Sequence, residues 1–387
     1  MSRPLDGLLV VSLEQAIAAP YCTRLLADQG ARVIKVERPD GGDFARAYDT
    51  RARGLASHFV WTNRSKESLA LDLKEERAVE GLKKILASAD VFVQNLAPGA
   101  AARLGLGPGQ LRADNPRLIT CSISGYGRSG PDEKRKAYDL LIQAEAGFLS
   151  VTGTRDEMAK SGISIADISA GVTAYHSILS ALIHRGRSGV GDNIEVSMLE
   201  AMAEWMGFPM YFAMDGAAPP QRNGAGHATI YPYGPYKTAD GGVMLGLQND
   251  REWTAFATDV LQRSDLAGDD RFKGNSGRAN HRDVLEPVIL ATFSTLNTEE
   301  AIARLERAGI ATARISDMAA LWAHPQLAAR QRWGEIGSPA GPLPALKPVS
   351  GDGWEPRLDP VPALGEHTET ILAEFGLDSL FSTKDSA

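Results

Sequence analysis

Short apolar runs alternate with amphipathic stretches along the first half of the chain. Runs rich in Val, Ile and Leu have the length of buried β-strands at residues 8–14, 31–37, 68–73, 90–95, 117–124 and 193–198. Between them apolar residues recur at helical spacing, and Pro20 and Gly30 are suited to bound the first helix. Helices of this length between strands imply right-handed crossovers and a parallel sheet, so we expect an α/β fold.

The pattern changes after residue 214. Gly, Pro and Ala dominate 215–227 and indicate a domain boundary. The Pro- and Gly-rich stretch 335–361 is long for a loop in a compact domain, so we expect it to cross between domains or subunits. Later helices are expected to begin near Arg251, Arg278 and Thr298, and a last one near 365–376.

The composition narrows the classes of function. The 387 residues include 41 Lys and Arg against 48 Asp and Glu, and the net charge of −7 disfavours general attraction to nucleic acid. Two cysteines and seven scattered histidines show no metal-ligand spacing, so we expect no metal. No apolar stretch reaches ~18 residues and no secretory pattern precedes the first strand, so we expect a cytoplasmic protein with no membrane partner.

The usual fingerprints of nucleotide and hydrolase chemistry are missing. The turn after the first strand reads EQAIAAP rather than GxGxxG, and no GxxxxGK[ST] occurs, which disfavours NAD, FAD and P-loop binding. No GxSxG is present, which disfavours a serine hydrolase of the α/β type. The chemistry therefore has to come from another group.

One carboxylate, Asp167, stands in the apolar and small-residue run GISIADISAG (162–171), before a helical pattern at 170–185. The commonest use of such an acid is a helix cap. The alternative is a nucleophile, which must be ionised, unhindered and partly desolvated. A helix N-terminus would lower its pKa, and the small neighbours Ala166, Ser169, Ala170 and Gly171 leave space for an acyl group.

Eight blocks in order along the chain resemble the class III CoA-transferases, a family that includes formyl-CoA:oxalate and carnitine CoA-transferases and the related 2-methylacyl-CoA racemases. The blocks are LLADQGARVIKVERPDGGDFAR (25–46), NRSKESLALDL (63–73), ADVFVQNLAPGAAARLGLG (89–107), SGYGRSGP (124–131), AYDLLIQAEAG (137–147), ADISAGVTA (166–174), HRGRSGVGDNIEVSMLEAM (184–202) and PALGEHTETIL (362–372).

The resemblance implies a role for Asp167. In the transferases the nucleophile is an Asp in a strand-to-helix turn of the form [G/A]-D-x-x-[A/T]-G, and Asp167 matches it. The family's reaction passes through an aspartyl mixed anhydride and an aspartyl-CoA thioester. A CoA thioester is then a substrate, no cofactor is tightly bound, and the nucleophile can also cap its helix.

The resemblance also implies a CoA site. Its expected residues are Ile17, Arg38, Asn95, Leu96, Arg103, Leu104 and Lys136, with Lys66 as a further candidate. Arg38 directly follows the strand at 31–37, at the carboxyl end where parallel sheets bind ligands. Read locally, Arg38 is equally a surface arginine, Arg103 a solvated helix residue and Lys136 part of a charged loop.

The triplet AYD separates the two branches of the family. Racemases carry a His in a GHD motif for proton transfer at the α-carbon, and here Tyr138 replaces it while Asp139 is retained. A tyrosine with a pKa near ~10 is a poor base for an α-proton, which favours a transferase. Asp139 is expected to orient or tune Asp167, or else to act as the N-cap of a helix at 140–150.

The expected substrate side lies beyond residue 221. Gly246 and Gln248, in LGLQND (245–250), are the candidates for a lid, although the glycine run of the oxalate enzymes is missing. RNGAGHATIYPYGPY (222–236) resembles members that act on C4 and C5 dicarboxylates, and Ile17 stands where oxalate enzymes have Gln. Carboxylate-binding candidates are Arg222, His227, Tyr231 and Tyr233, and the alternative is a plain domain linker.

The resemblance implies an interlocked homodimer. Its parts are expected to be a large Rossmann-like CoA-binding domain at 1–215, a smaller α+β domain at 222–317, and a segment at 318–387 that returns to the large domain. The expected activity moves CoA between an acyl-CoA, such as succinyl-CoA, and a carboxylic acid of the citramalate, mesaconate or itaconate type. A racemase-type isomerase, an intramolecular CoA-transferase and a non-catalytic CoA-binding protein remain as alternatives.

Overall fold

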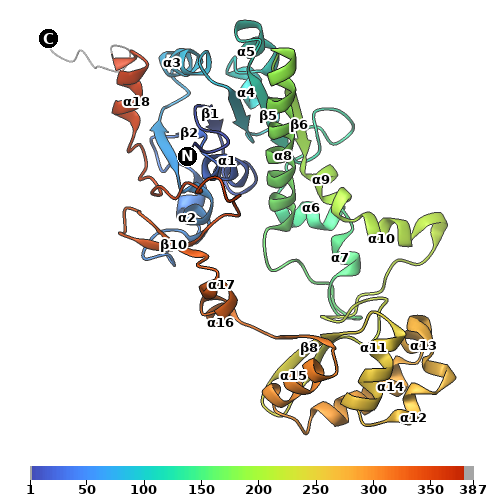
Figure 1. Ribbon diagram of the computed structural model, residues 1–387. Helices are drawn as coiled ribbons and strands as arrows, with labels where there is room; N and C mark the ends of the chain where they lie inside the picture. The colour runs from blue at the N-terminus through green and yellow to red at the C-terminus, as the bar shows by residue number, and fades with distance from the viewer. Residues whose placement is uncertain (1, 379–387) are drawn as a thin grey trace, which may run out of the picture. The chain divides into compact units, whose positions relative to one another are not determined.

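The computed structural model describes residues 2–378, which form two compact units. The first unit takes in Met1–Ala146, Ser161–Gly207 and Leu327–Ala387, and the second takes in Gly147–Lys160 and Phe208–Gln326. In Figure 1 the red helix α18 (Thr368–Glu374) therefore lies in the same unit as the blue N-terminal strands. Both ends of the described chain contribute to the first unit.

In the described residues, the first unit is built on a six-stranded sheet in the order β3-β2-β1-β4-β5-β6. All its pairings are parallel, as the sequence predicted. The strands are β1 (Leu9–Leu13), β2 (Arg32–Glu37), β3 (Lys66–Ala70), β4 (Val91–Gln94), β5 (Ile119–Ser124) and β6 (Asn193–Ser197). The β-branched and apolar residues of the central strands are buried on both faces, as parallel sheets require.

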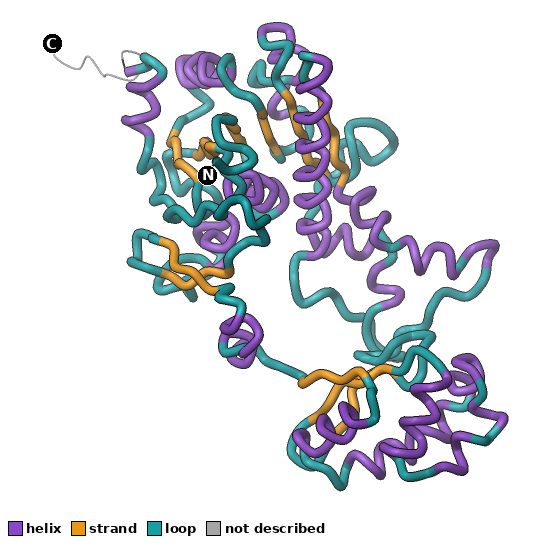
Figure 2. Tube along the Cα trace, in the orientation of Figure 1, coloured by secondary structure: helices purple, strands orange, loops and turns teal. Residues whose placement is uncertain are grey.

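Helices cover both faces of this sheet (Figures 1 and 2). The α-helices described in the first unit are α1 (Ala18–Asp28), α2 (Ser57–Asn63), α3 (Glu76–Leu86), α4 (Ala100–Arg103), α5 (Pro108–Asp114), α6 (Asp139–Glu145), α8 (Ile165–Ser188), α9 (Met198–Trp205) and α18. One core joins the sheet to α3, α5 and α18 through Val11, Ile34, Leu82, Leu111 and Ile371. The long helix α8 packs against α1 and α9.

The Pro- and Gly-rich stretch 335–361 differs from its prediction. Instead of a plain crossing segment, it takes part in an antiparallel hairpin of β10 (Trp333–Ile336) and β11 (Leu343–Leu346) within the first unit. Leu343 and Ala345 are buried while Pro344 and Leu346 are exposed, a period of two typical of a strand. The proline masked this pattern in the sequence, although an edge strand tolerates it.

The second unit combines a small sheet with helices. In its described residues β7 (Tyr233–Lys237), β8 (Gly242–Gly246) and β9 (Ala311–Arg314) form an antiparallel sheet in that order. The helices are α7 (Phe148–Val151), α10 (Gly207–Phe212), α11 (Asp250–Ala255), α12 (Ser264–Ala267), α13 (Gly274–Asn280), α14 (Arg282–Phe293), α15 (Thr298–Arg307), α16 (Met318–Trp322) and, at its border with the first unit, α17 (Pro325–Ala329). An aromatic core that includes Trp253, Phe256, Phe272 and Phe293 holds them together.

Two properties of residues 2–378 bear on function. None of the helices in this range has the length and apolar character needed to cross a membrane. Within the same range, His, Cys, Asp and Glu side chains do not gather in any group of three or more that could hold a metal ion.

Candidate active site

Asp167 is the third residue of helix α8. The expected strand-to-helix turn is wrong in this respect, because α8 begins at Ile165 and no strand precedes it directly. The sequence placed the helix five residues too late, since Ala166, Ser169 and Ala170 are buried small residues that show little apolar periodicity. Asp167 therefore lies inside the first helical turn rather than ahead of it.

The cap of α8 is Asp139, not Asp167. The Oδ1 atom of Asp139 accepts hydrogen bonds from the backbone N–H groups of Ala166, at 2.8 Å, and Asp167, at 3.1 Å. The residue at the N-cap position, Ser164, makes no capping bond with its side chain. Nor is Asp139 the N-cap of α6, because it is the first helical residue there. Across residues 2–378, no hydrogen bond to the carboxylate of Asp167 is formed.

Asp167 carries an unusual pKa. Burial, together with the negative charge of Asp139, raises the pKa of Asp167 to about 7. The expectation that the helix N-terminus would lower this pKa is wrong, because Asp139 already occupies the amide groups that would have stabilised the charge. Asp139 and Asp167, hereafter the acid pair, lie close enough for the charge of Asp139 to raise the pKa of Asp167, and neither forms a salt bridge within residues 2–378.

A buried glutamine fixes this arrangement. Gln143 is fully buried; its Nε2 donates to Asp139 Oδ2 at 2.6 Å and its Oε1 accepts from the Ser161 N–H at 2.9 Å. Gln143 thereby ties α6 to the segment that leads into α8. The sequence analysis did not single it out, although a glutamine beside Ile142 on the buried face of a predicted helix was a usable signal.

A close helix contact sets the position of Asp167. A Cβ on Gly171 would lie 2.7 Å from the carbonyl oxygen of Ala18, so the glycine allows α8 to approach α1. Residues four apart share one face of a helix, so Asp167 also lies on the face of α8 that meets α1. It stands one turn before the contact, toward the loop that precedes α1.

That loop, residues 15–17, lies between β1 and α1. Asn95, just after β4, holds it like a neighbouring strand: its Oδ1 accepts from the Gln15 N–H and its Nδ2 donates to the Gln15 carbonyl, both at 2.9 Å. In the order β3-β2-β1-β4-β5-β6 the chain reverses direction across the sheet between β1 and β4. Open parallel sheets bind ligands at the carboxyl ends of the strands where this reversal occurs, and the predicted CoA residues Ile17, Asn95 and Leu96 directly precede α1 or follow β4 there.

The other predicted CoA residues divide by exposure. Arg38 is exposed at the carboxyl end of β2 and donates to the Gly42 carbonyl. Arg103 and Lys136 are exposed, and Leu104 packs partly against the core. Lys66 is buried, and its ammonium donates to Glu14, the Pro20 carbonyl and Asn63 at 2.6–3.1 Å. Lys66 therefore has no donor left for a ligand, and burial lowers its pKa to about 8.

Two tyrosines of the first unit lie near the acid pair. Tyr138 is 67% exposed and directly precedes Asp139. Burial, together with the charges of Asp43 and Asp167, raises the pKa of Tyr48 to about 12, so its phenol stays protonated near neutral pH. The ring of Tyr48 contacts His58 edge-on at 5.5 Å. Tyr48 was not predicted from the sequence, because it follows a glycine-rich loop and belongs to no recognisable motif.

In the second unit, part of the predicted substrate residues gather. The rings of His227 and Tyr233 stack at 5.3 Å, and the Tyr233 ring lies directly over Gly246. The Nδ1 atom of His227 accepts from the N–H groups of Thr229 and Ile230, so its ring proton is on Nε2. Gly246 ends strand β8 and is paired with Tyr233 and Ala311, so it is not part of a free lid.

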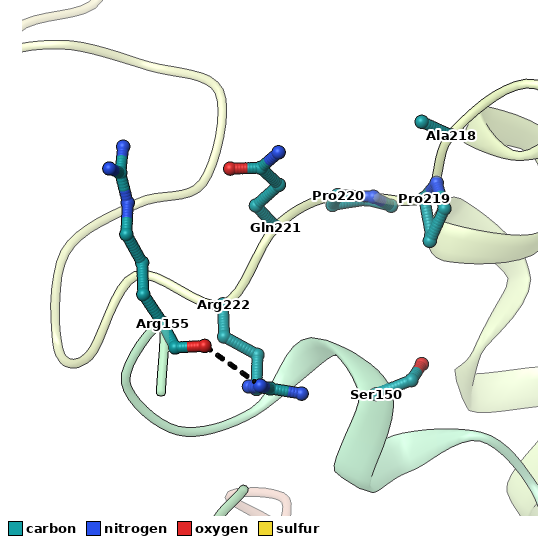
Figure 3. A pocket seen from close by; sticks show the side chains of 7 residues that line it. All are labelled: Ser150, Arg155, Ala218, Pro219, Pro220, Gln221 and Arg222. Atoms are coloured by element: carbon teal, nitrogen blue, oxygen red, sulfur yellow. Dashed lines mark hydrogen bonds between the residues drawn. The ribbon is translucent and has the colours of Figure 1, made fainter. Parts of the chain in front are cut away.

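The remaining predicted substrate residues lie apart from that group. Tyr231 is buried in the aromatic core, where burial raises its pKa to about 12. Gln248 is exposed just before α11. Arg222 lines an open pocket of about 450 Å³ with Ser150, Arg155 and Gln221 (Figure 3). Its guanidinium donates through Nε to the Thr154 carbonyl at 2.8 Å and through Nη2 to the Arg155 carbonyl at 2.9 Å.

Comparison with known proteins gives one consistent family. The sequence model of CoA-transferase family III matches residues 5–368. The chain is 32% identical to succinate–glutarate CoA-transferase of Agrobacterium fabrum over 382 residues, which cover 96% of this chain and 95% of the relative. It is 31% identical to succinyl-CoA:mesaconate CoA-transferase of Haloarcula marismortui over 395 residues, 97% of each.

A solved structure agrees with this assignment. The crystal structure of a CAIB/BAIF family protein from Brucella suis matches with a TM-score of 0.85 and 34% sequence identity. The match covers 97% of this chain and 100% of the Brucella chain.

Proposed function

The chain belongs to CoA-transferase family III and is an enzyme of the transferase class, and on this premise we propose that Asp167 is the nucleophile that carries CoA between two carboxylic acids. One observation carries the proposal: the carboxylate of Asp167 is partly buried, has no hydrogen-bond partner among residues 2–378 and has a pKa raised to about 7. A carboxylate of this kind is a stronger nucleophile than an ordinary aspartate, yet is about half ionised at neutral pH.

The proposed reaction balances without any cofactor. A carboxylate oxygen of Asp167 attacks the donor thioester carbonyl, the C–S bond breaks, and CoA leaves as a thiolate from a mixed anhydride. The thiolate attacks the aspartyl carbonyl and releases the donor acid, which leaves an aspartyl-CoA thioester. The acceptor carboxylate then displaces the thiolate to form a second anhydride. Attack of the thiolate on the acceptor carbonyl gives the new acyl-CoA and frees Asp167.

The proposed CoA site is the crevice between β1 and β4. Its floor is the 15–17 loop held by Asn95, and Leu96 supplies an apolar contact. Arg38, Arg103 and Lys136 are exposed cations in the same unit that would meet the phosphates of CoA. Lys66 is left out of this site because its three donors are used inside the protein.

The proposed substrates are C4 and C5 dicarboxylates. The two relatives described above are named for succinate, glutarate and mesaconate, and this chain shares about a third of its residues with them. We expect succinyl-CoA as donor, with glutarate or an acid of the citramalate, mesaconate or itaconate type as acceptor. Arg222 and the His227–Tyr233 stack are the candidates for the second carboxylate.

The racemase-type alternative is weaker. It needs a base for the α-proton, and the residue next to Asp139 is the exposed Tyr138 rather than a histidine. An intramolecular transfer of CoA between two carboxylates of one acid would use the same covalent steps. Isotope crossover between labelled and unlabelled dicarboxylates distinguishes it from the intermolecular reaction.

We also propose that the active form is a homodimer in the cytoplasm. Several apolar side chains of α10 and its surroundings are strongly exposed in the single chain, including Phe208, Met210 and Tyr211 at 56–80%. A second copy that covers them would remove this surface from water. Light scattering coupled to gel filtration gives the mass, and a monomer at micromolar concentration would count against the dimer.

An oxygen-transfer experiment tests the central proposal. The protein is incubated with succinyl-CoA and glutarate labelled with ¹⁸O in its carboxylates, and the peptide containing Asp167 is analysed by mass spectrometry. The second anhydride leaves one acceptor oxygen on Asp167, so we expect ¹⁸O there and hydroxylamine-trapped adducts at the same residue. New acyl-CoA without label or adduct at Asp167 would exclude the covalent route. Exchange of α-protons in a 2-methylacyl-CoA, without transfer, would favour the isomerase.

A further inference from the structure

The proposed reaction does not use a buried cluster of charges next to the 15–17 loop. Glu14, Lys35, Asp43 and Lys66, hereafter the charge network, are each at most 3% exposed. Lys35 lies 2.7 Å from Asp43 and 3.5 Å from Glu14, and Lys66 lies 2.6 Å from Glu14. Two carboxylates thus meet two ammonium groups, so the network carries no net charge.

One member of the network reaches the loop itself. The Oδ1 atom of Asp43 accepts hydrogen bonds from the N–H groups of Ala16, at 3.1 Å, and Ala45, at 2.9 Å. Its other oxygen, Oδ2, accepts from Lys35. The acceptor that holds Ala16 is therefore itself held by a lysine in the middle of strand β2.

Ala16 needs such an anchor. Its φ of 62° lies in the left-handed region, which an alanine disfavours because its Cβ crowds the backbone there. The N–H bond to Asp43 and the clamp of Asn95 on Gln15 are the side-chain contacts that hold the loop in this conformation. Strained backbone of this kind persists only where the surroundings fix it.

The loop also borders the space in front of Asp167. It leads directly into α1, whose first residue, Ala18, contacts Gly171 of α8, and Asp167 is one turn from that contact. Burial and the charges of Asp43 and Asp167 raise the pKa of Tyr48, so both carboxylates lie within electrostatic reach of its phenol.

We propose that Asp43, held by Lys35, is a positioning residue that keeps the 15–17 loop in the shape against which the CoA thioester is bound beside Asp167. This inference rests on the proposed function, because it assigns the loop as one wall of the CoA site. It extends that function by naming a residue that acts on substrate binding without touching the substrate.

A role in stability alone makes a different prediction. Buried ion pairs can often be replaced by apolar residues of similar volume with little loss of stability, whereas removing one partner is costly. The double variant Lys35→Met/Asp43→Leu removes both charges and the acceptor for Ala16. The single variant Asp43→Asn removes the nearer of the two anions beside Lys35, leaving Glu14 at 3.5 Å, but keeps an oxygen that can accept the Ala16 N–H.

The experiment compares these variants of the full chain by thermal unfolding, by calorimetric titration with CoA, and by steady-state kinetics with succinyl-CoA. We expect the double variant to be more stable than Asp43→Asn, yet to bind CoA about tenfold more weakly than the unaltered protein, with a matching rise in KM and kcat within about threefold. Asp43→Asn should bind CoA within about threefold of the unaltered protein.

The matched control is Asp28→Asn, at the other end of α1. Asp28 is also a buried carboxylate, paired with Arg64 at 2.8 Å and Arg24 at 2.8 Å, so its variant should lose stability without losing CoA affinity. Adding Ala16→Gly to the double variant should restore part of the affinity, because glycine adopts a positive φ without an anchor. If the double variant does not fold, Asp43→Ala takes its place; it removes the acceptor for Ala16 together with the negative charge, while Lys35 keeps Glu14 at 3.5 Å.

The outcomes separate this inference from the proposed function. A folded double variant that binds CoA as tightly as the unaltered protein would overturn the positioning role, and so would an equal loss in Asp28→Asn. Absence of ¹⁸O on Asp167 would instead contradict the covalent mechanism. The predicted order of CoA affinities would in that case still support the proposal that the 15–17 loop forms one wall of the CoA site.

Discussion

The first unit contains two groups of buried or partly buried acids that have opposite surroundings. In the charge network, Glu14 and Asp43 each have a lysine within 2.7 Å. In the acid pair, the donors to Asp139 within residues 2–378 are two backbone N–H groups and Gln143, and no lysine or arginine is among them. Burial opposes ionisation of Glu14, but Lys66 and Lys35 outweigh it and its pKa is lowered. The pKa of Asp167 is raised instead.

The difference separates structural carboxylates from a reactive one. A carboxylate matched by a cation and filled with hydrogen bonds is stable as an anion and has little tendency to attack a carbonyl. A carboxylate that has neither a cation nor hydrogen-bond donors beside it has a higher free energy as an anion, and forming a covalent bond to the substrate relieves this. Variants that alter either the acid pair and its supporting helix or the charge network test this difference.

Replacing the nucleophile should have the largest effect. Asp167→Asn is expected to reduce CoA transfer by at least about a thousandfold, because the amide cannot form the anhydride. The folded protein binds the proton of Asp167 more tightly than the unfolded chain does, so the free energy of unfolding falls as pH rises from about 4 to about 7. The variant escapes this loss and should be more stable by about 1–2 kcal/mol at pH 8.

Transfer assays and urea unfolding at pH 5 and pH 8 measure the two effects. The stability gain should appear at pH 8 and shrink toward pH 5. An Asp167→Asn protein that is less stable than the original at pH 8 would mean that the acid pair is not strained.

Removing one lysine from the charge network should lower the stability of the fold, in contrast to removing Asp167. Lys66→Met leaves Glu14 buried beside Lys35 alone, so we expect a loss of about 3–5 kcal/mol in the free energy of unfolding. The double variant Glu14→Gln/Lys66→Met removes the uncompensated charge and should recover more than half of the loss. Urea unfolding at pH 7 measures both, and equal stability of the two variants would contradict the matching argument.

A change at the helix contact tests whether the acid pair depends on the position of α8. Gly171→Ala puts a Cβ 2.7 Å from the Ala18 carbonyl, which should cost about 1–3 kcal/mol and reduce transfer about tenfold. Gly186→Ala is the control, because it lies in the same helix with open space around it and should be slightly stabilising. Similar behaviour of the two variants in unfolding and in transfer assays would show that the contact is unimportant.

The smallest expected effect is on pH dependence. Transfer needs ionised Asp167, so kcat/KM should rise with pH through about 7. Asp139→Asn keeps an oxygen for the α8 amides but removes the negative charge, so the midpoint should move to lower pH by roughly one unit. The pH profile of kcat/KM measures this, with burial of Asp167 left as the larger cause of its raised pKa. An unchanged midpoint would contradict the claim that the charge of Asp139 raises the pKa of Asp167.

The sequence predicted the parallel sheet well because short β-rich runs, most clearly those of β1, β2 and β4, alternate with helical patterns of sufficient length for crossovers. It failed at the start of α8, whose first turn is fixed by Asp139 from 27 residues away rather than by a local cap. The family resemblance suggested Lys66 as a further CoA residue, whereas the fold buries its ammonium against Glu14, which is 52 residues distant. Gln143, Asp43 and Tyr48 were missed for the same reason: their roles depend on partners that only the fold brings near.

The cap that Asp139 provides has a consequence for the order of folding. Between Asp139 and α8 the chain leaves the first unit at residue 147 and returns at 161. The turn that carries Asp167 cannot be completed by its own residues, so this excursion has to close before the turn is stable. The reactive centre should therefore be among the last parts to become protected from hydrogen exchange during refolding. A nascent or half-folded chain would then carry an ordinary, unreactive aspartate, and reactivity toward thioesters would itself report that folding is complete.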